Sequence, residues 1–291
     1  MKDISQPLVT IGIPFYNAEE YIKFAILSVV NQTYHNWELI LINDGSTDRS
    51  IEIALSFQDK RISVIDDGLN RGLIHRLNQL IKISNGLYFA RMDADDIMLA
   101  KRIENQVSYL LNNGKVDVLG TLAYSIDEKN NIIGKRGKTI QLTSFKTAVE
   151  ENIFIHPSVI GKKEWFLENL YDYSMERMED MELWIRTFNN SNFQVLDEPL
   201  IYYREVVINQ TKKFLQTSKG LRKLYSLLHL SKQISLMIML KLTLKTYIKD
   251  LVYIISAFLN LDSFLLKNRS IEIKPSEFQI ANRNLLIALN E

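Results

Sequence analysis

The sequence predicts an α/β fold, in which a mostly parallel sheet is flanked by helices and followed by a C-terminal helical extension. Short apolar runs alternate with segments whose apolar residues recur every three or four positions, and this alternation extends to Gly120. Glycine or asparagine follows several helical segments, as it does at helix C-termini. Strands that alternate with helices pair in parallel, because each helix returns the chain to the same end of the sheet.

Five strands are predicted before the alternation ends. They are Leu8–Ile13, Glu38–Ile42, Ile62–Ile65, Leu87–Met92 and Val116–Leu119. Helices are predicted between them, with apolar faces near residues 22–30, 48–55, 73–81 and 103–111.

A hairpin and one further helix are predicted beyond Gly120. The apolar runs Leu122–Ile126 and Ile132–Gly134 flank Asn130 and Asn131, and a turn between two such runs favours a hairpin. The later helix carries one apolar face, made by Met181, Trp184, Ile185 and Phe188.

The composition indicates a globular protein of a reducing compartment. The chain has 291 residues, of which 46% are hydrophobic, so it can bury a full core. It contains no cysteine, which excludes disulfides, thiolate metal sites and a cysteine nucleophile. The polar segment Met1–Pro7 leads directly into a strand, so we expect no signal peptide and a cytoplasmic protein.

Basic residues gather near the C-terminal end, although the net charge is only +1. Residues 206–250 hold nine Lys or Arg and one acid, Asp250. The longest uncharged run nearby, Leu251–Leu261, is shorter than the about 20 residues that span a bilayer. Basic residues interleaved with aliphatic ones suit an anionic membrane surface, contacted through residues 206–266. The alternative is a helical subdomain that docks its apolar face on the α/β domain.

Two parts are therefore expected, an α/β domain at residues 1–205 and a basic, amphipathic helical region at residues 206–291. We expect no nucleic-acid binding, because the lysines alternate with aliphatic residues rather than with stacking aromatics or glycine.

Polar residues follow three of the predicted strands. Tyr16 and Asn17 follow the first strand, Asn43 and Asp44 the second, and the segment 93–96 the fourth. Ligands of open α/β sheets bind at the carboxyl ends of the strands, so these residues are expected to meet at one edge. Neither a G-x-G-x-x-G sequence nor a P-loop is present, which argues against dinucleotide and P-loop phosphate binding.

Three carboxylates lie within four positions, at Asp93, Asp95 and Asp96. Such carboxylates repel one another unless a cation lies between them, and oxygen ligands suit Mg²⁺ or Mn²⁺. An acidic surface loop is the alternative.

Glu179 and Asp180 lie at the amino end of the helix that contains Met181. An aspartate at this place is commonly an N-cap. A catalytic base is compatible with that position, because the helix dipole and backbone amides favour an ionised carboxylate.

A series of motifs resembles the family 2 glycosyltransferases of bacterial polysaccharide synthesis, which have the GT-A fold. The matching segments are Val9–Asn17, Ser28–Tyr34, Leu41–Asp48, Asn70–Gly72, Ala90–Asp96, Glu179–Trp184 and Tyr202–Arg204. They follow the family's order over about two thirds of the chain. Ala100 and Lys101 depart from the usual pattern, in which proline precedes a polar residue, and the pattern ends near Glu205.

The resemblance implies roles for individual residues. Pro14 and Tyr16 would lie beside the base and ribose, and Asp44 would accept a hydrogen bond from the base. Asp95 would be the direct metal ligand and Asp93 a ribose contact or second ligand, with Asp96 assisting. Asp180 would be the catalytic base. The implied nucleotide-sugar site consists of Pro14, Tyr16, Asn17, Asp44, Arg71, Gly72, Asp93 and Ala94.

Four further residues are candidate contacts of the acceptor or the diphosphate: His156, Glu179, Trp184 and Arg204. Each has a structural alternative. His156 before a proline suits a loop, Trp184 suits the core, and Arg204 suits a closing strand. Arg186 is expected to pair with a nearby acid.

Residues and resemblance together predict an inverting, metal-dependent glycosyltransferase that uses Mn²⁺ or Mg²⁺. The donor is a nucleoside-diphosphate sugar, with UDP favoured by resemblance, and the acceptor is a hydroxyl of a saccharide or glycolipid in cell-surface polysaccharide synthesis. The transferred group would be a hexosyl or N-acetylhexosaminyl group. We expect the protein to be cytoplasmic or bound peripherally to the inner face of the cell membrane.

Two alternatives have different sequence signatures. A sugar nucleotidyltransferase typically carries a glycine-rich loop with a basic residue after its first strand, whereas this chain has Pro14–Asn17. A non-catalytic nucleotide-sugar binding protein would lack the base or the metal carboxylates, and both are present.

Overall fold

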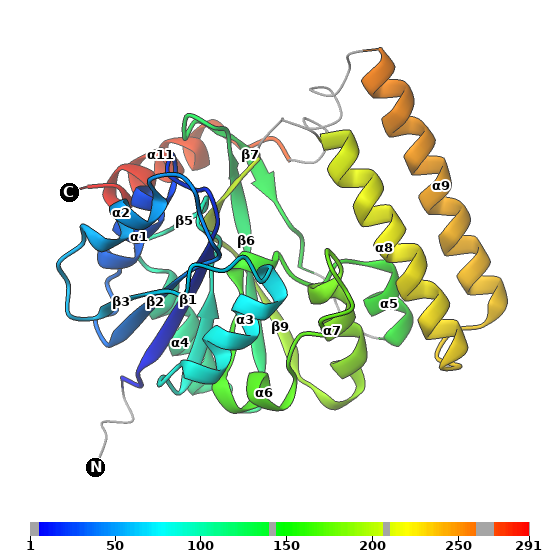
Figure 1. Cartoon of the computed structure of the whole chain (residues 1–291), viewed down its shortest axis with the longest axis horizontal. Coiled ribbons are helices and arrows are strands. Elements are labelled where there is room, and N and C mark those ends of the chain that lie inside the picture. Colours follow the sequence, from blue (N-terminus) through cyan, green and yellow to red (C-terminus); the bar gives the residue numbers. More distant parts are fainter. Residues whose placement is uncertain (1–5, 140–143, 206–209, 260–270, 291) are drawn as a thin grey trace.

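The computed structural model describes residues 6–139, 144–205, 210–259 and 271–290. Within them, nine strands form one mixed sheet in the order β3-β2-β1-β4-β8-β6-β9-β5, with β7 paired to β6 (Figure 1). The strands are β1 (Val9–Phe15), β2 (Trp37–Asn43), β3 (Ile62–Asp66), β4 (Tyr88–Arg91), β5 (Ile97–Met98), β6 (Val118–Ile126), β7 (Ile132–Arg136), β8 (Ile160–Lys162) and β9 (Phe193–Arg204).

The parallel arrangement predicted from the sequence holds for the first four strands. β1 pairs in parallel with β2 and β4, and β2 pairs in parallel with β3. Beyond them, β8 is antiparallel to both β4 and β6, whereas β6 and β9 run parallel. The hairpin is confirmed as β6–β7.

One prediction about strands was wrong. The runs Val116–Leu119 and Leu122–Ile126 were expected as separate strands, but β6 continues through Gly120. A side chain at this position would collide with the ring of Phe154. The glycine therefore marks a close approach to the strand and not its end.

Helices cover both faces of the sheet. In the catalytic part they are α1 (Ile22–Val30), α2 (Ser50–Leu55), α3 (Leu73–Ile83), α4 (Arg102–Asn112), α5 (Phe145–Glu150), α6 (Lys163–Glu168) and α7 (Glu179–Thr187), with single 3₁₀ turns at His156–Ser158 and Phe188–Asn190. Apolar residues of α1 and α4 pack on one face of the sheet. Those of α3, α6 and α7 pack on the other.

The C-terminal helices occupy two separate places (Figure 1). α8 (Gln210–Leu230) and α9 (Leu236–Phe258) form a hairpin, and α8 packs through Leu224 and Leu228 against Met178 of the catalytic part. Within the hairpin, the ring of Phe214 stacks on that of Tyr253 at 3.6 Å. No helix among the described residues has the length and apolar character needed to cross a bilayer.

α11 (Pro275–Ala288) returns to the sheet. Its Ala281 carbonyl accepts a hydrogen bond of 2.6 Å from the Tyr202 hydroxyl of β9. At its C-terminal end, Asn31 Nδ2 donates to the carbonyl of Ala288. The division at residue 205 stays a prediction, and the region that follows it contains both a projecting hairpin and a helix docked on the sheet.

Gly86, between α3 and β4, provides a test of this packing. A Cβ at Gly86 would lie 2.5 Å from Thr10 N, 2.7 Å from Tyr88 O and 2.8 Å from Leu8 O, all backbone atoms. We expect Gly86→Ala to lower the free energy of unfolding by about 2–3 kcal/mol, measured by urea denaturation. Gly114→Ala is the matched control, since its Cβ would meet no atom within 4 Å. Equal stability of the two variants would contradict the packing described.

Candidate active site

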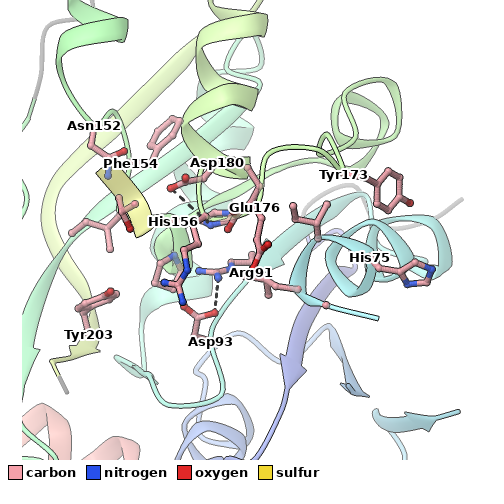
Figure 2. Close-up of a pocket in the computed structure, with 18 of the residues that line it drawn as sticks. His75, Arg91, Asp93, Asn152, Phe154, His156, Tyr173, Glu176, Asp180 and Tyr203 are labelled. Atoms are coloured by element: carbon pink, nitrogen blue, oxygen red, sulfur yellow. Dashed lines mark hydrogen bonds and ion pairs between the residues drawn. The ribbon is translucent and has the colours of Figure 1, made fainter. Parts of the chain in front are cut away.

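A cavity of about 830 Å³ lies where α3, β4, the turn at His156 and α7 approach one another (Figure 2). Its polar lining residues include Asn70, Arg71, Arg91, Asp93, Arg136, His156, Glu179, Asp180 and Tyr203. In Figure 2, Asp180 and His156 lie on one side of Arg91, and Asp93 lies on the other. The cavity thus joins residues from loops that are far apart in the sequence.

The predicted acidic cluster is present. Carboxylate oxygens of Asp93, Asp95 and Asp96 lie within 4.8 Å of one another. Burial, followed by the charge of Asp93, raises the pKa of Asp95 to about 6. Burial and the charge of Asp95 also raise the pKa of Asp96, and its Oδ2 atom has no hydrogen-bond partner among the described residues. Carboxylates that repel one another, with one buried oxygen that lacks a partner, fit a divalent cation.

Arg204 fixes the loop that carries this cluster. Its backbone N–H donates to Asp96 Oδ1 at 2.9 Å, and its Nε donates to the carbonyl of Asp95 at 2.7 Å. The rest of the guanidinium donates to the Asp127 carbonyl and the Asn130 side chain. These contacts support the structural alternative for Arg204, which does not line the cavity formed by the described residues.

Arg91 is a residue to which the sequence reasoning gave no role. Its side chain is buried, and Nη2 contacts Asp93 Oδ1 at 2.5 Å. Nε and Nη1 have no hydrogen-bond partner among the described residues. The only available signal was its place two residues before Asp93, inside a motif already noted.

Asp44 holds the loop that borders the cavity. Its carboxylate accepts hydrogen bonds from the backbone N–H groups of Arg71 at 2.8 Å and Gly72 at 3.0 Å. Arg76 Nε donates to the same carboxylate at 2.8 Å. Arg76 is fully buried and was missed by the sequence reasoning. The contact of Asp44 with a nucleotide base stays a prediction.

The remaining nucleotide-site residues lie at the ends of β1 and β4. Pro14 is buried beside Ile42 of β2, whereas Tyr16 is 52% exposed. Asn17 adopts a φ of 47°, and its side-chain oxygen accepts a hydrogen bond of 2.8 Å from Thr47 N. Ala94 is buried within the acidic loop. Their contacts with a nucleotide stay predictions.

Glu179 and Asp180 begin α7, as predicted. The N-cap alternative for Asp180 is wrong, because Met178 is the N-cap and Asp180 is already helical. Asp180 Oδ1 accepts a hydrogen bond of 2.7 Å from Met181 N. Burial raises the pKa of Asp180. Burial, followed by the charge of Asp180, raises the pKa of Glu179 to about 7.

His156 and Trp184 have different surroundings. His156 Nδ1 lies 4.0 Å from Asp180 Oδ2, and Nε2 forms a 2.8 Å hydrogen bond with the Tyr171 hydroxyl. Trp184 is 1% exposed and packs its ring against those of Phe154 and Trp165. Trp184 therefore belongs to the core. Arg186 pairs with Glu182 at 2.7 Å, as expected.

Comparisons with known proteins show the family to which the chain belongs. The family model for glycosyl transferase family 2 matches residues 10–170. An uncharacterised glycosyltransferase of Methanocaldococcus jannaschii is 34% identical over 235 residues, which are 77% of this chain and 78% of that protein. The Escherichia coli UDP-Glc:alpha-D-GlcNAc-diphosphoundecaprenol beta-1,3-glucosyltransferase WfgD is 32% identical over 190 residues, 65% of this chain and 73% of WfgD.

Two solved structures share the fold at low sequence identity. Staphylococcus aureus TarS 1–349 in complex with UDP-GlcNAc superposes with a TM-score of 0.61 at 17% identity, over 75% of this chain and 65% of that one. The Pyrobaculum calidifontis mannosyltransferase PcManGT, in complex with GDP-Man and Mn²⁺, superposes with a TM-score of 0.58 at 16% identity, over 97% and 86%.

The fold is thus the GT-A fold of nucleotide-sugar-dependent glycosyltransferases, as predicted. The chain belongs to glycosyl transferase family 2.

The acidic cluster predicts a metal-dependent gain in thermal stability. A divalent ion relieves the repulsion between Asp95 and its neighbours, so Mn²⁺ at a hundred times its Kd should add about 2.7 kcal/mol, or about 5 °C in Tm. Calorimetry measures this shift. Asp95→Asn should raise the Tm of the metal-free protein and remove the response to Mn²⁺.

Glu52→Gln, which neutralises an exposed carboxylate of α2, serves as the control and should respond to Mn²⁺ as the wild type does. A full Mn²⁺ response in Asp95→Asn would exclude Asp95 as a ligand.

Proposed function

We propose that this protein transfers a sugar from a nucleoside diphosphate to an acceptor hydroxyl, with inversion at the anomeric carbon. One observation carries the proposal. Asp180 and Asp93 line a single cavity, with Arg91 between them, although 87 positions separate the two aspartates in the sequence. A base and an acidic cluster at opposite sides of one cavity suit an in-line displacement, in which the acceptor and the leaving group occupy opposite faces of the sugar.

Asp180 acts as the general base in this proposal. Its Oδ2 atom accepts the proton of the acceptor hydroxyl as the oxygen attacks the anomeric carbon, and the nucleoside diphosphate leaves. A positioned base contributes about 10²–10⁴-fold. Asp95 and Asp93 would hold a Mn²⁺ or Mg²⁺ ion, which supplies positive charge for the diphosphate. No protein nucleophile is required.

The donor is proposed to be a UDP-sugar, with a hexosyl or N-acetylhexosaminyl group. WfgD is named for UDP-glucose, and TarS binds UDP-GlcNAc in the structure compared. PcManGT binds GDP-Man instead, so likeness of fold does not decide which nucleotide base the donor carries. The family favours glycosyl transfer over the nucleotidyl-transfer alternative. Asp180 facing the cavity argues against a purely binding role.

The acceptor is proposed to be a saccharide or glycolipid of cell-surface polysaccharide synthesis, reached at the inner face of the membrane. WfgD is named for an undecaprenol-linked acceptor. Figure 1 shows α9 outside α8, away from the sheet. Its exposed apolar residues are Leu236, Met237, Leu240, Leu244, Tyr247, Ile248, Leu251, Val252, Ile254, Ile255 and Phe258.

Three exposed lysines follow one flank of this apolar face: Lys241, Lys245 and Lys249. An apolar face edged by lysines matches the boundary between acyl chains and anionic headgroups. Thr217 of α8 lines the cavity, so the same hairpin connects the proposed membrane face with the site. A lipid-linked acceptor would thereby enter the cavity from the membrane side.

Asp180→Asn tests the assignment of the base. The amide cannot accept the acceptor proton, so transfer should fall about 10²–10⁴-fold while UDP binding in Mn²⁺ is kept. The measurements are turnover with UDP, dTDP and GDP sugars side by side, and calorimetric titration with UDP. Near-normal turnover by Asp180→Asn would reject Asp180 as the base.

The same assignment sets the pH dependence of the wild type. A base must be deprotonated to act, and burial raises the pKa of Asp180 above its ordinary value. Donor kcat/KM should therefore be high at neutral pH and fall on the acidic side at a higher pH than the about 3.9 at which an ordinary aspartate titrates. A rate that stays constant down to about pH 4 would contradict this.

Membrane binding has its own test. Replacing Lys241, Lys245 and Lys249 by Gln removes three charges at about 1 kcal/mol each, so affinity for phosphatidylglycerol vesicles should fall roughly 100-fold. Co-sedimentation with vesicles measures the affinity, and phosphatidylcholine vesicles show the non-electrostatic part.

The matched control replaces three exposed lysines of the catalytic part by Gln, at Lys60, Lys82 and Lys115. Equal losses for the two triple variants, or no binding by the wild type, would refute a membrane role for α9.

A further inference from the structure

A chain of buried polar side chains leads from α3 to Asp180. Asn78 of α3 is fully buried and forms two hydrogen bonds of 2.9 Å with the backbone of Tyr171. The Tyr171 hydroxyl, on a side chain 1% exposed, bonds to His156 Nε2 at 2.8 Å. His156 Nδ1 then lies 4.0 Å from Asp180 Oδ2. Figure 2 shows His156 and Asp180 directed toward each other.

This series of hydrogen-bonded side chains connects three segments of the protein. Apolar side chains could have filled the same space. Burying a hydroxyl, an amide and an imidazole costs free energy unless each is hydrogen-bonded. Every member before Asp180 has such a partner, and the neighbouring rings of Trp184 and Tyr171 hold the imidazole of His156 on two sides. The position and the orientation of the His156 imidazole are therefore fixed.

Both middle members are neutral. Burial, followed by the charge of Arg91, lowers the pKa of His156 well below its ordinary value. Burial raises the pKa of Tyr171, so its hydroxyl keeps a proton to donate. A neutral histidine carries one N–H, and a partner at one ring nitrogen selects the nitrogen that carries it.

We propose that His156 is a positioning residue for the base. The Tyr171 hydroxyl donates a hydrogen bond to Nε2, which leaves the N–H of His156 on Nδ1, directed at Asp180 Oδ2. The proposal rests on Asp180 being the base of the proposed reaction. Met181 N already fixes Oδ1. With His156 opposite Oδ2, the carboxylate is held at both oxygens and presents its remaining lone pair to the cavity.

The distance of 4.0 Å is longer than a hydrogen bond. Catalytic hydrogen bonds in ligand-free proteins are often long and shorten when the substrate binds. The proposal requires a small turn of the Asp180 side chain that brings Oδ2 within hydrogen-bond distance of Nδ1.

The tautomer of His156 is the first test, and it uses the wild-type protein without substrate. Nitrogen-15 NMR of the full chain distinguishes Nδ1–H from Nε2–H, and comparison with His156→Phe assigns the signal among the four histidines. We expect His156 to be neutral and protonated at Nδ1. Protonation at Nε2 would place a lone pair against the carboxylate and would overturn the proposal.

Kinetics give the second test. Tyr171→Phe removes the hydroxyl alone and should lower kcat about tenfold, as loss of an orienting partner does elsewhere, with donor KM nearly unchanged. The matched control is Tyr202→Phe, which removes an equally buried hydroxyl that bonds to Ala281 on the opposite side of the sheet. This control should keep wild-type kcat.

Three outcomes would overturn the proposal. They are a wild-type kcat in Tyr171→Phe, a loss of kcat no larger than that in Tyr202→Phe, and a change in donor KM alone. Should Tyr171→Phe fail to fold, His156→Phe takes its place with the same expected loss of kcat. Absence of any transfer by the wild type would reject the proposed function, whereas the tautomer would still decide the place of the proton on His156.

Discussion

The buried charge of Arg91 is the interaction on which the site depends. Six carboxylates of the described residues surround the cavity or lie beside it, at Asp93, Asp95, Asp96, Glu176, Glu179 and Asp180. Burial raises the pKa of Asp95, Asp96, Glu179 and Asp180, and in each case the charge of Arg91 acts in the opposite direction. A cation among carboxylates this close offsets their repulsion, which proton uptake otherwise relieves. Arg91 does so from within the protein, and a bound divalent ion would add to it.

The sheet explains why these charges meet. β1, β2 and β4 run parallel, so the loops that follow them emerge at the same edge. Charged side chains then hold these loops through their backbone atoms. Asp44 binds the backbone of the loop at Arg71, and Arg204 binds the loop at Asp95. These contacts place the site on a rigid frame, which is what precise positioning of reacting groups requires.

The molecule separates this frame from its exposed apolar surface. α11 is bonded to β9 through Tyr202 and completes the catalytic part. The α8–α9 hairpin instead shares one apolar cluster with Met178 of the frame and leaves the outer apolar face of α9 uncovered by any described residue. Exposing so much apolar area costs solubility, which is consistent with a surface that acts on a partner.

The sequence by itself determined the first strands and helices and the kinds of residue in the site. Strands β1 to β4, the run of three aspartates and the place of Asp180 at the start of α7 were predictable, because period and spacing are local properties of the chain. Tertiary structure alone decided the rest. The antiparallel insertion of β8, the pairing of Asp44 with Arg76 and the approach of His156 to Tyr171 and Asp180 join residues distant in sequence. No local pattern encodes such contacts, since they arise only when packing brings the elements together.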